Sequence, residues 1–555
     1  MIGNMQAHSL TTAMLIDHAE RNHAQTEIVS RAPDCTLQRT TWSELAHDAK
    51  RLAAALTDLG VSPGDRVATF AWNRIPHLAL YYGVTAAGMV LHTVNPRLFS
   101  DQIEYIINHG GASVLCVDPD LLHLIEPLAD RLTAIKRIIV LCSKNEIPDS
   151  SLTSLIAYDE LVAGANPIDE WPELEENSAA TLCYTSGTTG NPKGVLYSHR
   201  STVLHSYSIV AADAMALSAK DCALLITPLF HVNAWGVPFA SALCGAKLVL
   251  PGSALDGASL YEFLKDEGVT FSLGVPTVWF GVLDYLEKNT SASEREAMAI
   301  NRVFVGGAGV PRSLIVRFRE LLGIDVLQSW GMTETSPVAT VCRPLSKHDR
   351  LDQEARTDLM TSQGRALCGV ELRVESADGS EIPLGSNEAG LLKVRGPWVV
   401  SHYFGQEPNS ALDDHGWFDT GDVAWIDGDG FLHITDRAKD VIKSGGEWIS
   451  SIEIENAAVA HPAVTEAAAI PVPHPRWQER PLLLITLNPG QKLSRDEMLD
   501  YLKPQMASWW LPDDVVVVEE LPHTATGKLR KIDLRERYRN HFTADSDSIE
   551  KQAVS

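Results

Sequence analysis

The 555-residue chain lacks the features that define several classes of protein. Its eight cysteines include no CxxC pair, which argues against a zinc cluster or a disulfide framework and predicts buried free thiols in a reducing cytoplasm. No apolar run reaches the roughly 18 residues that a membrane span needs. The N-terminal segment has no basic region and no long apolar core, so we expect no signal peptide.

Positive charge is scarce as well. The chain has 46 lysines and arginines against 71 aspartates and glutamates, which gives a formal net charge of −25. Such a field repels nucleic acids and anionic lipids, which argues against a general nucleic-acid binder. Any ligand that carries phosphate must therefore be held by local groups that overcome this field. Hydrophobic residues make up 45% of the chain, enough for the cores of roughly two or three globular units.

Strand and helix patterns alternate along much of the chain up to residue 330. A capping box, Thr41-Trp-Ser-Glu44, opens a helix that ends at Gly60, and helices are also predicted over 77–88 and 100–109. Repeated βαβ units imply a mostly parallel sheet and the α/β class. The strands of this pattern are predicted over residues 67–72, 89–94, 112–118, 223–227, 247–250, 270–273, 302–305 and 325–329.

The last quarter of the chain has a different pattern. Residues 425–434 alternate around an Asp-Gly turn and predict a hairpin. Further capping boxes begin at Ser450 and Ser494, and strands are expected near 467–471 and 482–487, so we expect a small α+β domain. Three other segments carry expectations of their own: a surface connection over 143–178, a hinge within 436–446 and a disordered tail over 541–555.

The densest chemical signal is the run Tyr184-Thr-Ser-Gly-Thr-Thr-Gly-Asn-Pro-Lys-Gly194. Three glycines allow backbone amides to turn toward a ligand, and four hydroxyls and Lys193 add hydrogen-bond donors. This inventory suits a polyphosphate. A Walker A loop would need glycine at the position of Pro192, so the run predicts a different kind of phosphate loop.

The run resembles the phosphate-binding signature of the adenylate-forming superfamily, which includes acyl-CoA synthetases, luciferases and the adenylation domains of peptide synthetases. Four further segments resemble motifs of that family and follow in the family's order. The overall pattern is most similar to bacterial medium- and long-chain fatty acyl-CoA synthetases. The four segments are Gln328-Ser-Trp-Gly-Met-Thr-Glu334, Gly416-Trp-Phe-Asp-Thr-Gly-Asp422, Asp436-Arg-Ala-Lys-Asp-Val-Ile-Lys-Ser-Gly-Gly-Glu447 and Pro522-His-Thr-Ala-Thr-Gly-Lys528.

The resemblance implies two domains. A large N-terminal domain over residues 1–436 would combine mostly parallel sheets and helices with a β-rich subdomain, and would carry the nucleotide and acyl sites. A small, mobile α+β domain over 437–540 would carry a catalytic lysine, Lys528.

The resemblance also assigns an ATP site. Glu334 would anchor Mg²⁺, a hard ion that favours oxygen ligands, and Thr185 would be a second oxygen ligand. Asp422 would accept hydrogen bonds from the ribose hydroxyls, while Arg437 would contact the ribose from the far side. The other nucleotide contacts that it implies are Ser186, Gly187, Thr188, Thr189, Gly190, Lys193, Gly307, Ala308, Gln328, Ser329, Trp330, Gly331, Met332, Thr333 and Trp448.

Catalysis and thiol transfer are assigned to the C-terminal motifs. Lys528 would reach both the acyl carboxylate and the α-phosphate, and Lys439 matches the hinge about which the small domain rotates. Gly445 and Gly446 would line the passage for the pantetheine arm of CoA, in the same segment as Lys443. Candidate contacts to the CoA phosphates are Arg476, Arg480, Arg530 and Lys531, although each of them fits an ordinary solvated charge better.

The acyl site is expected at the segment from Pro228 to Trp235. In similar long-chain enzymes a tryptophan at the position of Trp235 gates the acyl tunnel, and His231 would lie beside the carboxylate. Trp448 stands where aryl-CoA ligases of the family often have glutamine, which favours an aliphatic acid. The remaining acyl contacts that the resemblance implies are Asn233, Gly236, Gly306 and Gly309.

The sequence therefore predicts an ATP-dependent acyl-CoA ligase that forms an acyl-adenylate and uses Mg²⁺, ATP and CoA, with a medium- or long-chain fatty acid as substrate. We expect a cytoplasmic enzyme that could form a homodimer. The alternatives are a CoA ligase for short thioether acids or aryl acids, an acyl-AMP ligase that loads a carrier protein, and a nucleotide sensor without activity. The presence of Lys528 together with Glu334 and Asp422 argues against the sensor, since binding alone does not need the lysine.

Overall fold

The computed structural model describes residues 3–185, 191–445, 447–523 and 529–542. The chain divides into two compact units. The large unit comprises Met1–Glu371 and Arg395–Phe418, and the small unit comprises Leu372–Val394 and Asp419–Ser555. The predicted functional boundary at 436/437 stays a prediction, and residues 543–555 of the predicted tail lie outside the described residues.

One sheet of the large unit has seven strands in the order β7-β6-β5-β3-β4-β8-β9. Every neighbouring pair is parallel except β8 and β9, which form an antiparallel pair. This confirms the predicted βαβ pattern. The strands are β3 (Arg66–Phe70), β4 (Val90–Thr93), β5 (Val114–Val117), β6 (Arg137–Val140), β7 (Ile156–Ala157), β8 (Ala179–Tyr184) and β9 (Gly194–Ser198).

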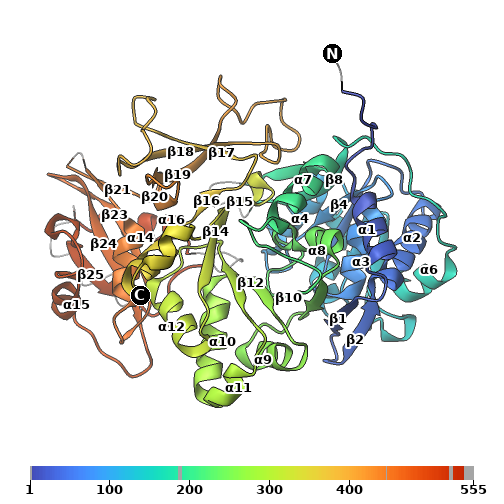
Figure 1. Ribbon diagram of the computed structural model, residues 1–555, viewed down its shortest axis with the longest axis horizontal. Coiled ribbons are helices and arrows are strands. Elements are labelled where there is room, and N and C mark those ends of the chain that lie inside the picture. Colours follow the sequence, from blue (N-terminus) through green and yellow to red (C-terminus); the bar gives the residue numbers. More distant parts are fainter. Residues whose placement is uncertain (1–2, 186–190, 446, 524–528, 543–555) are drawn as a thin grey trace. The chain divides into compact units, whose positions relative to one another are not determined.

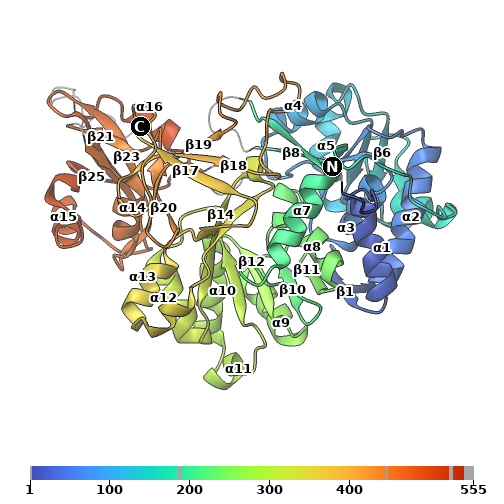
Figure 2. The same ribbon diagram turned by 45° about the horizontal axis from the view of Figure 1, so that its top comes forward.

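Helices flank this sheet, and α1, α2 and α3 lie side by side in Figure 1 and Figure 2. The predicted capping box is present, because the Thr41 side chain accepts from the Glu44 amide and the Glu44 carboxylate accepts from the Thr41 amide. The segment 143–178 is more than a surface connection, since it contributes β7 and α6. The helices are α1 (Thr12–Asn22), α2 (Trp42–Asp58), α3 (Ile75–Thr85), α4 (Ser100–Gly110), α5 (Leu122–Ile125) and α6 (Tyr158–Gly164).

The second sheet of the large unit has nine strands in the order β16-β15-β14-β13-β12-β10-β11-β1-β2. The strands from β14 to β1 are parallel, and β15, β16 and β2 are added antiparallel at the two ends. The strands are β1 (Glu27–Arg31), β2 (Leu37–Thr41), β10 (Cys222–Leu225), β11 (Lys247–Leu250), β12 (Phe271–Gly274), β13 (Arg302–Val305), β14 (Val326–Gly331), β15 (Val338–Val341) and β16 (Arg365–Ala366).

Helices connect most of these parallel strands. One of them, α12 (Arg312–Leu322), ends at Gly323, which has the left-handed conformation with φ 68°. The helices of this part are α7 (His199–Val210), α8 (Val237–Cys244), α9 (Gly257–Asp266), α10 (Pro276–Asn289), α11 (Ala292–Glu296), α12 (Arg312–Leu322) and α13 (Gln353–Met360).

Antiparallel pairing dominates the small unit. A four-stranded sheet has the order β17-β18-β19-β20, with β17 (Glu371–Glu375), β18 (Gly390–Arg395), β19 (Phe418–Ile426) and β20 (Leu432–Arg437). The predicted hairpin is the β19–β20 pair, in which Ile426 faces Leu432 across the Asp-Gly turn.

The C-terminal part of the small unit is a five-stranded sheet with apolar cores on both faces. Ala469 and Leu483 belong to one core and Ala468 and Leu482 to the other, as the alternation of side chains along a strand requires. Its elements are β21 (Ile442–Ser444), β22 (Glu447–Ile449), β23 (Val464–His474), β24 (Gln478–Leu487), β25 (Asp514–Val517), α14 (Ser451–Val459), α15 (Arg495–Leu502) and α16 (Lys531–Arg537).

All eight cysteines are free, as predicted, but Cys35 and Cys368 are exposed rather than buried. Among the residues that the structure describes, we find no helix with the length and hydrophobicity of a membrane span.

Candidate active site

The neck of the predicted phosphate loop lies at the end of β8. The Thr185 amide donates to the Lys193 carbonyl over 2.9 Å, and the Lys193 amide donates to the Thr185 hydroxyl over 3.2 Å. These two bonds close the base of the loop at the carboxyl end of a strand, where ligands of α/β sheets usually bind. Ser186, Gly187, Thr188, Thr189 and Gly190 lie outside the described residues, so their assignment to ATP stays a prediction.

Glu334 and Lys193 meet through Tyr403, a residue that the sequence analysis missed. The Tyr403 hydroxyl donates to Oε1 of Glu334 over 2.7 Å, and Nζ of Lys193 lies 4.6 Å from the centroid of the same ring. Burial and the Glu334 carboxylate raise the pKa of Tyr403 well above its usual value, so the phenol keeps its proton. A lone tyrosine with no motif around it gave no signal in the sequence.

The residues present fit a magnesium ion that is completed by ATP. In the part of the chain that the structure describes, no group of three or more His, Cys, Asp or Glu side chains could hold a metal by itself. Mg²⁺ usually binds one or two carboxylates and takes its other ligands from phosphates and water. The buried carboxylate of Glu334, with one oxygen bound by Tyr403, is a suitable single anchor.

The predicted adenine segment forms β14 and the turn after it. Gly331 has no room for a side chain, because a β-carbon there would collide with the Pro337 carbonyl. The Gln328 amide is occupied within the fold, since it donates to the carbonyls of Met360 and Thr361 over 3.1 and 2.8 Å. The remaining predicted contacts lie on the same strand and turn: Ser329, Trp330, Met332 and Thr333.

A tight left-handed turn carries the predicted acyl gate. Four consecutive non-glycine residues, from Val232 to Trp235, have φ between 46° and 56°, and Gly236 follows at 77°. Each such residue costs roughly 1–2 kcal/mol relative to ordinary backbone. Hydrogen bonds hold the turn, because the Asn233 amide donates to the Thr181 hydroxyl over 2.9 Å. Asn233 therefore fixes the turn, and its assignment to the acyl group stays a prediction.

The indole of Trp235 lies against the glycine strip after β13. A β-carbon at Gly306 would lie 3.1 Å from the indole, and one at Gly307 would lie 3.8 Å from it. Trp235 is buried and His231, which precedes the turn, is half-buried. The structure thus brings the predicted gate and the predicted glycine strip together, with Gly307, Ala308 and Gly309 exposed beside them.

In the small unit, the predicted ribose residues contact each other. Asp422 on β19 faces Arg437 on β20, and Nε of Arg437 lies 2.8 Å from Oδ1 of Asp422. Arg437 is thus the ion-pair partner of Asp422, and its contact with the far side of the ribose stays a prediction. Asp422 is buried, whereas Arg437 is exposed to solvent.

The predicted CoA segment is the β21–β22 hairpin. Its Gly445 has φ 61° and donates its amide to the Trp477 carbonyl, and Trp477 is 41% exposed. Lys443 and Trp448 are paired across the hairpin. Gly446 and Lys528 lie outside the described residues. Lys439 is exposed in the connection between β20 and β21, where its carbonyl accepts from Arg535 over 2.6 Å.

The four residues predicted as candidate contacts to the CoA phosphates differ in the groups that they already contact. Arg480 is bound to Asp513 and to the carbonyls of Trp509 and Leu511. Lys531 is half-buried and forms an ion pair with Glu455 over 2.6 Å. Arg530 lies 3.2 Å from Asp533. Arg476 instead stacks over the Trp477 ring, 4.6 Å from its centroid.

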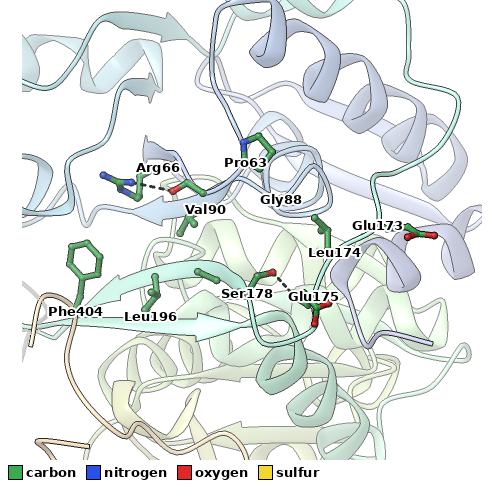
Figure 3. Close-up of a pocket in the computed structure, with 12 residues that line it drawn as sticks. Pro63, Arg66, Gly88, Val90, Glu173, Leu174, Glu175, Ser178, Leu196 and Phe404 are labelled. Atoms are coloured by element: carbon green, nitrogen blue, oxygen red, sulfur yellow. Dashed lines mark hydrogen bonds between the residues drawn. The ribbon is translucent and has the colours of Figure 1, made fainter. Parts of the chain in front are cut away.

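A separate cavity of about 360 Å³ lies beside the seven-stranded sheet. Figure 3 shows Phe404 and Leu196 toward one end of it and Leu174 toward the other, with Arg66 bound to the Gly64 carbonyl. None of the predicted site residues lines it.

Comparison with known proteins identifies two family matches. The AMP-binding enzyme family matches residues 16–404, and the family of AMP-binding enzyme C-terminal domains matches residues 453–528. A medium-chain-fatty-acid–CoA ligase of Ectopseudomonas oleovorans is 46% identical over 549 residues, 99% of this chain and 100% of the relative.

Two other similar proteins bear on the site. A 3-methylmercaptopropionyl-CoA ligase of Ruegeria lacuscaerulensis is 47% identical over 543 residues, 98% of this chain and 100% of the relative. The solved structure of an O-succinylbenzoate coenzyme A synthetase from Bacillus subtilis, in complex with ATP and magnesium ion, matches with a TM-score of 0.76 at 26% identity. That match covers 94% of this chain and 99% of the other.

Proposed function

The chain belongs to the AMP-binding enzyme family, and from this membership we propose that it is an ATP-dependent acyl-CoA ligase. In the first step a carboxylate oxygen of the acid attacks the α-phosphorus of ATP, and pyrophosphate leaves. In the second step the thiol of CoA loses its proton and attacks the acyl carbon, and AMP leaves. The observation that carries the proposal is the contact of Lys193 and Glu334 with one tyrosine at the neck of the phosphate loop.

The residues divide the work of the first step. Lys193 and the loop amides would bind the phosphates, and Glu334 with Thr185 would hold Mg²⁺, which neutralises charge on the phosphates when bound. Asp422 would hold the ribose. Lys528 would bridge the carboxylate and the α-phosphate, which brings together two anions that otherwise repel.

Thiol transfer would follow a movement about Lys439, with pantetheine passing Gly445 and Gly446. We propose Arg476 as the cation that meets the phosphates of CoA, because its guanidinium lies on an exposed indole rather than in a carboxylate pair. The predicted cytoplasmic location fits eight free cysteines. The homodimer stays a prediction.

The acid that we propose is a medium-chain fatty acid, with a longer chain still open. Its support is the end-to-end similarity to a medium-chain ligase and the placement of Trp235 over Gly306 and Gly307. The second candidate is a short thioether acid, which the similarity to the 3-methylmercaptopropionyl-CoA ligase favours.

A substrate panel tests the proposal. Purified protein with ATP, Mg²⁺ and CoA is given butyrate, octanoate, palmitate, 3-methylmercaptopropionate or benzoate, and both pyrophosphate and acyl-CoA are measured. We expect octanoate to give the highest kcat/KM. Highest activity with 3-methylmercaptopropionate would establish the second candidate. Pyrophosphate release without acyl-CoA would indicate a carrier-loading enzyme, and no release with any acid would overturn the proposal.

A further inference from the structure

The segment that carries Tyr403 is fixed at both ends to the candidate active site. The Val400 amide donates to the Glu334 carbonyl over 2.8 Å, and the Phe404 amide donates to the Gly194 carbonyl over 2.8 Å. One bond leads to the turn of the predicted metal ligand and the other to the end of the predicted phosphate loop. The backbone on either side of Tyr403 therefore spans the two elements.

Apolar packing fixes the ring itself. Val400 and Tyr403 pack on a buried cluster formed by Cys183, Val195, Tyr197 and Val232. Three of these residues, Cys183, Val195 and Tyr197, lie on β8 and β9, the strands that flank the phosphate loop. The ring of Tyr403 is thus anchored in the core on one side and presents its hydroxyl and its face to charged groups.

Tyr403 offers a different interaction to each charge. Its hydroxyl gives the Glu334 carboxylate a charge-assisted hydrogen bond, and its π face attracts the Lys193 ammonium. A cation–π contact is weak enough to yield to a phosphate, whereas a direct lysine–carboxylate pair would have to be broken by the ligand. The ring therefore gives each group a partner that leaves it available to bind.

We propose that Tyr403 is a positioning residue that keeps Glu334 and Lys193 from pairing with each other. Glu334 is then available to bind the metal ion, and Lys193 is available to bind the phosphates of ATP. This inference rests on the proposed function and adds to it a residue outside the recognised motifs. It predicts that loss of the hydrogen bond alone and loss of both contacts have different effects on nucleotide binding.

Two variants separate the contacts. Tyr403→Phe removes the hydrogen bond to Glu334 and keeps the ring over Lys193, whereas Tyr403→Leu removes both. Tyr207→Phe, which deletes the hydroxyl of a tyrosine that is 48% exposed on α7, is the matched control. Calorimetry measures the Kd for ATP in EDTA and again with Mg²⁺, and melting temperature reports folding.

In Tyr403→Phe we expect the Kd in EDTA to stay within about twofold, while the gain in affinity on adding Mg²⁺ falls by about tenfold, the effect of one lost hydrogen bond to a charged group. In Tyr403→Leu the Kd in EDTA should also rise, by about threefold or more. If Tyr403→Leu does not fold, Tyr403→Met takes its place.

Equal effects of the two variants on both affinities, or effects no larger than those of Tyr207→Phe, would overturn the positioning role. If the wild-type protein does not bind ATP at all, the proposed function itself is overturned. The two failures are therefore distinguishable in one set of titrations.

Discussion

Lys528 is the residue whose removal best separates the two half-reactions. We predict that Lys528→Ala lowers acyl-AMP formation by roughly 10²–10³, because one preorganised charge contact typically contributes about 3–4 kcal/mol to a barrier. Attack of CoA on supplied acyl-AMP should be largely preserved. Rapid-quench assays of each half-reaction measure this, and equal damage to both would contradict a lysine that acts only in the first.

Glycine 236 is a residue whose identity follows from its surroundings. Its φ is 77°, and a β-carbon there would lie 2.6 Å from Nδ1 of the buried His205, whose Nε2 accepts the Val338 amide. Gly60 has a similar φ of 86° but has no atom within 4 Å of a built β-carbon. An alanine at Gly60 would therefore cause backbone strain alone, whereas an alanine at Gly236 would cause backbone strain and a steric conflict with His205.

We predict that Gly60→Ala lowers the free energy of unfolding by about 1–2 kcal/mol, the strain of a left-handed residue with a side chain. Gly236→Ala should cost at least about 1 kcal/mol more, since His205 must move or be compressed. Urea unfolding monitored by fluorescence measures both. Equal losses in the two variants would show that the contact with His205 adds nothing.

At the scale of elements, the connection between β20 and β21 combines a predicted hinge with a fixed contact. Nη1 of Arg535 on α16 lies 2.6 Å from the Lys439 carbonyl and 2.6 Å from Oδ1 of Asp440. The Ser451 amide at the start of α14 donates to Asp436 over 2.6 Å. The hinge segment is thus bound to two helices of its own unit. The acceptors are the Lys439 carbonyl and the carboxylates of Asp436 and Asp440, and a substitution that removes only the Lys439 N–H keeps all three.

Lys439→Pro tests the hinge because proline fixes φ while the carbonyl that Arg535 binds is retained. We predict that pyrophosphate exchange stays within about threefold of wild type, whereas acyl transfer to CoA falls by about tenfold or more, as expected when a conformational step is blocked. A parallel loss in both assays, or a lower melting temperature, would show a folding defect or a hinge at another position.

Local patterns predicted elements better than contacts. The capping box at Thr41 and the β19–β20 hairpin were predictable because each depends on residues within a few positions of one another. The contact between Tyr403 and Glu334 joins residues 69 positions apart, and no periodicity reports such a distance. Likewise, the side-chain amide of Gln328 donates to the carbonyls of Met360 and Thr361, more than 30 positions away, and no local pattern indicates these contacts.

At the scale of the whole large unit, buried neutral histidines couple folding to pH. Burial lowers the pKa of His77 and His199 to about 4 and that of His92 and His205 to about 3. The unfolded chain takes up these protons below about pH 6.5, whereas the folded chain does not. Stability is therefore fully present above that pH and is lost as the pH falls.

His92 gives the clearest test because neither of its ring nitrogens has a hydrogen-bond partner among the residues that the structure describes. Burial is the main cause of its low pKa, and the nearby Arg66 and His109 side chains lower it further. Between pH 7 and about pH 5, we predict that the free energy of unfolding of His92→Leu falls by about 2 kcal/mol less than that of wild type. Urea titrations at both pH values measure the difference, and parallel pH profiles would contradict it.

The edge position of β9 has a practical consequence. β9 is the last strand of its sheet, it begins directly after the predicted phosphate loop, and Leu196 at its centre is 40% exposed. A fluorescent label at position 196 would lie on the same hairpin as the loop yet outside every predicted ligand contact. Occupancy of the nucleotide site could then be followed optically in real time, without a coupled assay and before any acid is added.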